Sequence, residues 1–108
     1  FMKTILIPVF ENRISSRLDC TENFQIIKTE EKNITKSEVI KIVAKNPIEK
    51  LNAIKSLNPS TIICNGLTDF YKEEILKNNI EIIAWIHGNI NEIINSFLNG
   101  KLKSKIEL

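Results

Sequence analysis

The sequence has few of the residues that build disulfide scaffolds, phosphate-binding loops and membrane spans. Its 108 residues include two cysteines, three glycines and one histidine, and its formal net charge is +2. Two cysteines cannot make a disulfide scaffold, and a charge so close to zero predicts neither a nucleic-acid nor a membrane partner. No apolar run approaches the roughly 20 residues of a transmembrane helix. We therefore expect a cytoplasmic protein whose two thiols are normally reduced.

Common enzyme motifs are absent as well. The chain has no glycine-rich phosphate loop, no Gly-x-Ser-x-Gly elbow and no Cys-x-x-Cys pair. A two-metal nuclease needs clustered carboxylates, one of them on the first strand, and residues 4–9 contain none. These absences predict a binding protein rather than an enzyme.

The residues that are present have the balance of an ordinary globular domain. Hydrophobic residues make up 43% of the chain and charged residues 26%, which is far from the composition of a disordered chain. We predict that residues 2–100 form a single domain and that residues 101–108 form a basic, solvated tail. The tail holds the only cluster of basic residues, Lys101, Lys103 and Lys105.

Apolar runs and capping residues predict five strands and three helices. The predicted strands are residues 3–9, 24–29, 34–44, 61–64 and 80–86, with a hairpin turn at 30–33 in which Asn33 tolerates positive φ. Helices are predicted to begin at N-caps Asn46, Thr68 or Asp69, and Asn89, and Gly100 follows the last. Their apolar stripes are Ile48, Leu51, Ile54 and Leu57; Phe70, Ile75 and Leu76; and Ile90, Ile93, Ile94, Phe97 and Leu98.

The order of these elements is β-β-β-α-β-α-β-α. Strands separated by helices pair in parallel through right-handed crossovers, and the hairpin adds one antiparallel strand. The prediction is a three-layer α/β domain with a five-stranded mixed sheet of order 3-2-1-4-5. In it strand 2 is antiparallel and helices cover both faces. This topology suggests a ribonuclease-H-like fold.

Every cysteine and histidine of the chain is predicted to lie at the carboxyl edge of this sheet, where open α/β sheets bind ligands. Cys20 lies in a long polar loop at residues 10–22, Cys64 ends the fourth strand, and His87 follows the fifth. Thiolate and imidazole are ligands for soft metals and iron–sulfur clusters. Each residue also has a structural interpretation, since Cys64 can be a core residue and His87 can fill a turn. Cys20 lies among polar residues, where packing explains little.

Four segments of the chain resemble the dinitrogenase iron–molybdenum cofactor biosynthesis family. The segments are residues 7–24, 46–50, 61–66 and 83–86, and they occur in the family's order and spacing. The first begins Ile-Pro-Val-Phe-Glu-Asn-Arg, includes Cys20 and ends at Phe24. The resemblance implies a ribonuclease-H-like fold and a non-enzymatic carrier or chaperone for an iron–sulfur cluster or the iron–molybdenum cofactor, with a link to nitrogen fixation. It also implies cluster donor and acceptor proteins as partners. Nitrogenase-associated members often have a His-Phe-Gly-like stretch where this chain has residues 17–20, so a histidine ligand there is not carried over.

The number of ligands favours transient binding. A simple iron–sulfur cluster usually takes four thiolates, whereas this chain offers two. A monomer can add His87 to Cys20 and Cys64, a homodimer can pool the cysteines, and a preassembled cofactor needs only one or two protein ligands. Arg13 and Arg17 can pair with the negative charge of such a cofactor.

Two other interpretations stay open. The chain can be a metal-free protein-interaction or regulatory module in which the cysteines only pack. It can also be a thiol-dependent enzyme or redox sensor, with Cys20 as the reactive thiol or with a Cys20–Cys64 disulfide under oxidation.

Overall fold

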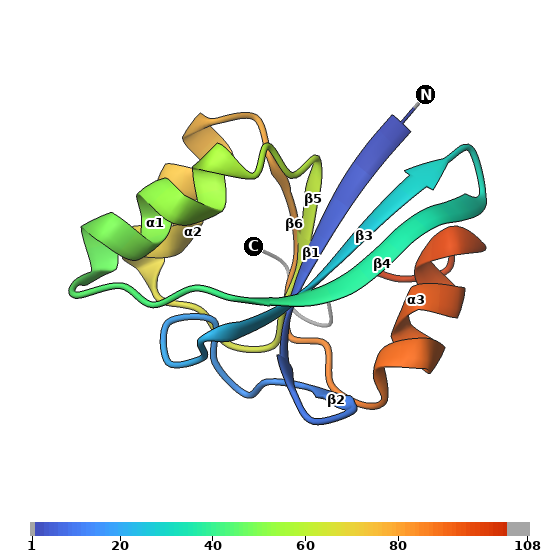
Figure 1. Cartoon of the computed structure of the whole chain (residues 1–108), viewed down its shortest axis with the longest axis horizontal. Helices are drawn as coiled ribbons and strands as arrows, with labels where there is room; N and C mark the ends of the chain where they lie inside the picture. The colour runs from blue at the N-terminus through green and yellow to red at the C-terminus, as the bar shows by residue number, and fades with distance from the viewer. Residues whose placement is uncertain (1, 104–108) are drawn as a thin grey trace.

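A computed structural model describes residues 2–103 as three layers, with one sheet between helices. Figure 1 shows α1 and α2 together on one face of the sheet and α3 on the other. The strands are β1 (Met2–Phe10), β2 (Arg13–Ile14), β3 (Asn23–Glu30), β4 (Asn33–Lys41), β5 (Thr61–Ile63) and β6 (Glu81–Ile83). The helices are α1 (Pro47–Ser56), α2 (Asp69–Lys77) and α3 (Ile90–Leu98). The predicted mixed α/β architecture is therefore confirmed.

The sheet has six strands rather than the predicted five. Its main path runs β4-β3-β1-β5-β6, in which β1 pairs antiparallel with β3 and parallel with β5, and β2 pairs with β1 off this path. The extra strand arises because Glu11 takes a positive φ of 57° and turns the chain back onto β1. Ile14 is buried by this turn, so part of the expected loop at residues 10–22 is ordered structure. The ribonuclease-H-like assignment itself stays a prediction.

The two faces of the sheet carry separate cores because successive side chains of a strand point to opposite sides. Leu6 of β1 packs with residues of α1 and α2, whereas its neighbours Ile5 and Ile7 pack on the side of α3. Burying each such side chain contributes roughly 1.5–3 kcal/mol. Thus the alternation along β1 fixes which helices cover which face.

The predicted helix starts are confirmed, and the caps show why. The Asn46 side chain accepts a hydrogen bond from the backbone N–H of Glu49 at 2.8 Å, and Pro47 occupies the first helical position. Thr68 and Asn89 cap α2 and α3 in the same way. Gly100, with φ of 71°, follows α3.

The predicted apolar stripes of α1 and α2 are partly wrong. Ile48 is 63% exposed and Phe70 is 41% exposed, whereas Tyr71 is only 2% exposed and packs in the core. Tyr71 and Ile75 are four residues apart, so they share the face of α2 that meets the sheet. Ile48 and Phe70 lie in the first turn of their helices. Leu76 is exposed as well.

Two turns also differ from the predictions. In the hairpin between β3 and β4, the positive φ falls on Glu31, at 58°, rather than on Asn33. The last strand ends at Ile83 instead of residue 86, because Trp85 has a φ of 63° and turns the chain. Trp85 is half-buried and packs against the core on the α1 and α2 side.

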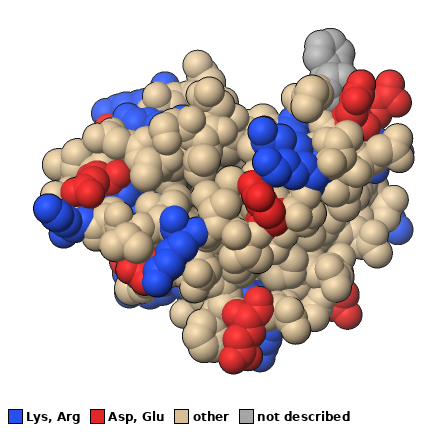
Figure 2. Space-filling view, viewed as in Figure 1, with Lys and Arg blue, Asp and Glu red and all other residues tan. Residues whose placement is uncertain are grey.

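Outside the core, the surface carries mixed charge. Figure 2 shows basic and acidic side chains interspersed over the viewed face instead of a patch of one sign. Within residues 2–103, no helix is both long enough and apolar enough to cross a membrane. The predicted tail at 101–108 lies mostly outside the described residues, and this includes Lys105.

Candidate functional site

A groove of about 900 Å³ opens at the carboxyl edge of the sheet, on the side of α1 and α2. One wall is the segment from Asp19 to Glu22, which leads into β3. The other wall is the connection from β4 into α1, and the first turn of α2 closes the end. The groove is therefore built by three segments that lie far apart in the sequence.

The wall that carries Cys20 is held to the rest of the protein through its backbone. Leu18 donates its N–H to the carbonyl of Gly66 at 2.9 Å, and Gly66 donates its N–H to the carbonyl of Ser16 at 3.0 Å. The Leu18 side chain is fully buried, and the Thr21 hydroxyl donates to the carbonyl of Val9 at 3.2 Å. An alanine Cβ at position 66 would lie 3.0 Å from the Ser16 carbonyl oxygen, so this close approach favours glycine.

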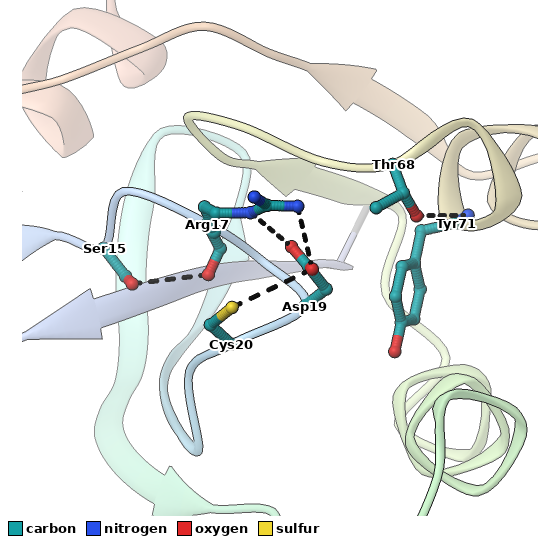
Figure 3. A network of polar contacts seen from close by, with 6 residues as sticks. All are labelled: Ser15, Arg17, Asp19, Cys20, Thr68 and Tyr71. Carbon is teal, nitrogen blue, oxygen red and sulfur yellow. Dashed lines mark hydrogen bonds and ion pairs between the residues drawn. The ribbon is translucent and has the colours of Figure 1, made fainter.

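Cys20 is an exposed thiol at the groove wall. Figure 3 shows its sulfur and the Arg17 guanidinium both directed at the carboxylate of Asp19. Cys20 donates to Asp19 at 3.8 Å, and Arg17 donates to both oxygens of the same carboxylate at 3.1 and 3.0 Å. The hydrogen bonds and charge of Asp19 raise the pKa of Arg17. Arg17 is thus engaged with Asp19 and does not line the groove.

Lys50 is the buried cation of the groove, and the sequence analysis gave it no role. It is 7% exposed, its ammonium donates to the carbonyl of Thr21, and Nζ lies 5.7 Å from the centre of the Phe24 ring. Burial lowers the pKa of Lys50, and the negative charges of Asp19, Cys20 and Glu22 oppose that shift. The available signal was a lysine directly beside Leu51, on the buried side of an amphipathic helix.

Tyr71 is the second groove residue that sequence reasoning missed. Its ring stacks edge-on against Phe70, with the ring centres 5.6 Å apart, and its hydroxyl donates over 3.5 Å to the carbonyl of Pro47. Burial raises the pKa of Tyr71, and the charges of Asp19 and Cys20 add to the shift. The groove therefore contains a neutral phenol hydroxyl as well as a lysine.

Cys64 belongs to the core. It has no exposed surface, its N–H donates to the carbonyl of Ile83 at 2.9 Å, and its carbonyl accepts from Ile86 at 3.1 Å. Burial raises the pKa of the Cys64 thiol to about 12. The side chain does not line the groove, and both cysteines are free thiols.

His87 and Arg13 lie together in another part of the same edge. His87 is exposed in the turn before α3, and the carbonyl of the next residue, Gly88, accepts from Ile14 of β2 at 3.1 Å. Arg13 forms an isolated β-bridge with Asn89. Neither side chain lines the groove.

Of the five predicted site residues, the groove therefore contains Cys20 alone. Among residues 2–103, no three His, Cys, Asp or Glu side chains are grouped so that they could hold a metal ion. Cys20, Cys64 and His87 accordingly do not form a closed metal site in this arrangement. The ionisable groups that do meet at the groove are one thiol, two carboxylates, two lysines and a phenol, and two threonines and an asparagine line it as well.

Comparison with known proteins gives structural neighbours only. No family model and no curated protein matches the chain. A protein named PH0822 shares 20% identity, with 96% of each chain covered and a TM-score of 0.87. A protein of Methanocaldococcus jannaschii provisionally named a dinitrogenase also shares 20% identity, with 100% and 99% coverage and a TM-score of 0.81. The apo orange protein from Desulfovibrio gigas shares 10% identity, with 96% and 93% coverage and a TM-score of 0.77. At these identities the likeness shows a common fold.

Proposed function

We propose that this chain is a non-enzymatic carrier that holds a metal–sulfur cluster transiently in the groove through Cys20. The observation that carries the proposal is an exposed thiol on the wall of a groove of about 900 Å³ at the carboxyl edge. Thiolates are the usual protein ligands of such clusters, and this edge is where open α/β sheets bind ligands. The cargo is an iron–sulfur cluster or an iron–molybdenum cofactor or precursor, exchanged with donor and acceptor proteins.

The ligand set fits cargo better than a resident cluster. A resident cluster needs about four thiolates, and the groove offers one. To act as a ligand, Cys64 would have to leave the core and lose its thiol proton, and burial raises the pKa of that thiol to about 12. A preassembled cofactor has most of its metal valences filled by its own sulfides, so a single thiolate can tether it. Weak attachment of this kind suits release to an acceptor.

The names of the structural neighbours agree with this theme. One is provisionally named a dinitrogenase, and the orange protein is described as an apo form, which implies a bound group in another state. These neighbours support a cofactor-related role and add no residue-level evidence.

The test is anaerobic reconstitution with iron and sulfide, or with extracted cofactor, followed by desalting and measurement of retained metal and visible absorption. Wild type, Cys64→Ser and His87→Ala should retain metal, and Cys20→Ser should lose it. Retention by Cys20→Ser would show that the tether is another residue. No retention by any variant would overturn the carrier function.

A second candidate is a metal-free protein-interaction module. Two exposed apolar side chains, Ile48 and Phe70, line the groove. If they form a protein contact, Ile48→Ser and Phe70→Ser will abolish partner capture, whereas Cys20→Ser will leave it intact. Loss of capture on Cys20→Ser would contradict this candidate.

A further inference from the structure

Lys50 is a buried positive charge whose neighbouring acids are already engaged. Asp19 accepts two hydrogen bonds from Arg17 and one from Cys20, and the Glu22 carboxylate lies 3.7 Å from the Lys41 ammonium. Among the described residues, no carboxylate lies within ion-pair distance of the Lys50 ammonium. Its protein contacts are the neutral carbonyl of Thr21 and the ring of Phe24.

A charge in this position is costly for the free protein. Buried ammonium groups are normally paired with an opposite charge, since one carbonyl replaces only part of the lost hydration. The lysine ammonium has three donors, and the carbonyl of Thr21 uses one. The groove beside it is the space from which a compensating negative charge can come.

The rest of this end of the groove is also suited to an anion. Residues of the first turns of α1 and α2 line it, and both helices therefore direct the positive ends of their dipoles towards it. Tyr71 of α2 lines the same end, and its hydroxyl can exchange the long 3.5 Å bond to the carbonyl of Pro47 for one to an anion. The acids on the opposite wall, Asp19 and Glu22, are held by Arg17 and Lys41, which reduces their repulsion of an incoming anion.

We propose that Lys50 is the charge-selecting residue of the groove, and that the groove binds compact anions at the end formed by Lys50, Tyr71 and the two helix starts. The ammonium forms an ion pair with the ligand, and the carbonyl of Thr21 orients it. Neutral and cationic molecules gain nothing there and leave the lysine unpaired. This inference deepens the proposed function by giving its cargo a net negative charge, yet anion binding at Lys50 does not require that the cargo be a cluster.

A structural role for Lys50 is the competing explanation, because its hydrogen bond ties α1 to the segment that carries Cys20. The two roles differ in what a ligand does to the lysine. A structural lysine keeps its proton affinity when anions are added. A ligand-pairing lysine gains proton affinity, since the bound negative charge stabilises the ammonium.

The experiment titrates the full chain with sulfate and, separately, inorganic phosphate at constant ionic strength balanced by chloride. Backbone amide spectra report binding, and lysine-labelled protein reports the Lys50 titration. We expect saturable shifts at residues 20–22, 46–50 and 68–71, and a higher Lys50 pKa at saturating anion. Lys50→Met should weaken binding at least about tenfold, as for a lost charged hydrogen bond. Lys50→Arg should retain part of it.

Two lysine variants serve as controls. Lys45→Met removes an exposed groove lysine and should weaken binding by at most about threefold, because exposed charges are screened. Lys101→Met, far from the groove, should leave it unchanged. If wild type shows no saturable shifts, or Lys50→Met binds as wild type does, the inference is overturned. If Lys50→Met does not fold, a wild-type Lys50 pKa that saturating sulfate leaves unmoved overturns it as well. Anion binding together with failed cluster retention would overturn only the carrier function.

Discussion

The two cysteines lie at the same edge of the sheet in opposite environments. Cys20 is exposed on a groove wall, whereas Cys64 has no exposed surface and packs between strands and helices. The sequence analysis placed both cysteines at the carboxyl edge of the sheet, where ligands were expected to bind. Their chemistry is decided instead by what covers them, because only an accessible thiolate binds metal or reacts.

The largest expected difference between them is in alkylation. In native protein at pH 7, Cys20 should react with iodoacetamide at least about 1000-fold faster than Cys64, since a pKa near 12 leaves only about one thiolate in 10⁵ and burial blocks the reagent. Peptide mapping over time gives both rates, with urea-unfolded protein as the control in which they converge. Similar native rates would mean that the Cys64 region opens readily.

The second difference is in how stability depends on pH. Folding raises the pKa of Cys64 from 9.0 to about 12, so above pH 9 the unfolded chain releases a proton that the folded chain keeps. The contribution of Cys64 to the free energy of unfolding is intact below pH 9. It is lost as the pH rises to 12, at about 1.4 kcal/mol per pH unit. Urea unfolding at pH 8 to 10.5 should show this extra slope in wild type relative to Cys64→Ala. Parallel curves would contradict the assignment of Cys64 to a dry core.

The exposed cysteine still depends on a buried neighbour. Leu18 lies two residues before Cys20 and is fully buried. Leu18→Ala should lower the free energy of unfolding by about 2–5 kcal/mol through the cavity it leaves. Val43→Ala, at a site 69% exposed, should change it by less than about 0.5 kcal/mol. Equal effects in urea unfolding would show that the segment holding Cys20 is not anchored in the core.

The smallest effect is expected at the opposite groove wall. Asn46→Ala removes the side-chain acceptor that caps α1 and should cost about 1 kcal/mol. Asn52→Ala, on the exposed face of the same helix, should be neutral or slightly stabilising, because alanine has the higher helix propensity. Thermal unfolding of the two variants compares them directly, and a cost at Asn52 as large as at Asn46 would argue against the cap.

Local signals explain why much of the fold was predictable. Asn46 and Pro47 specify a helix start by their own chemistry, and the apolar run in β1 is recognisable without its neighbours. β2 was missed because a two-residue strand has no periodicity. It exists through its pairing with β1.

The site was less predictable because its residues meet only through tertiary packing. Lys50 and Tyr71 come from different helices, and neither belongs to a motif that signals a ligand. Cys20 was predicted from its polar surroundings, and the structure shows it exposed at the groove, whereas its role as a ligand stays a prediction. Nothing local distinguishes Cys64 from a ligand, since its burial depends on α1 and α2 covering that face.

Two backbone hydrogen bonds at Gly66, which we call the seam, hold the groove wall that carries Cys20. This wall is the frame of the groove, and its fold does not depend on the side chain at position 20. The two hydrogen bonds that join Gly66 to Ser16 and Leu18 involve no side chain, and the buried contact there is made by Leu18. The exposed side chain at position 20 takes no part in the seam. Position 20 should therefore tolerate substitution during evolution. Cys20→His should leave the unfolding midpoint near that of wild type. A substitution at position 20 would then change the chemistry of the groove wall without disturbing its frame.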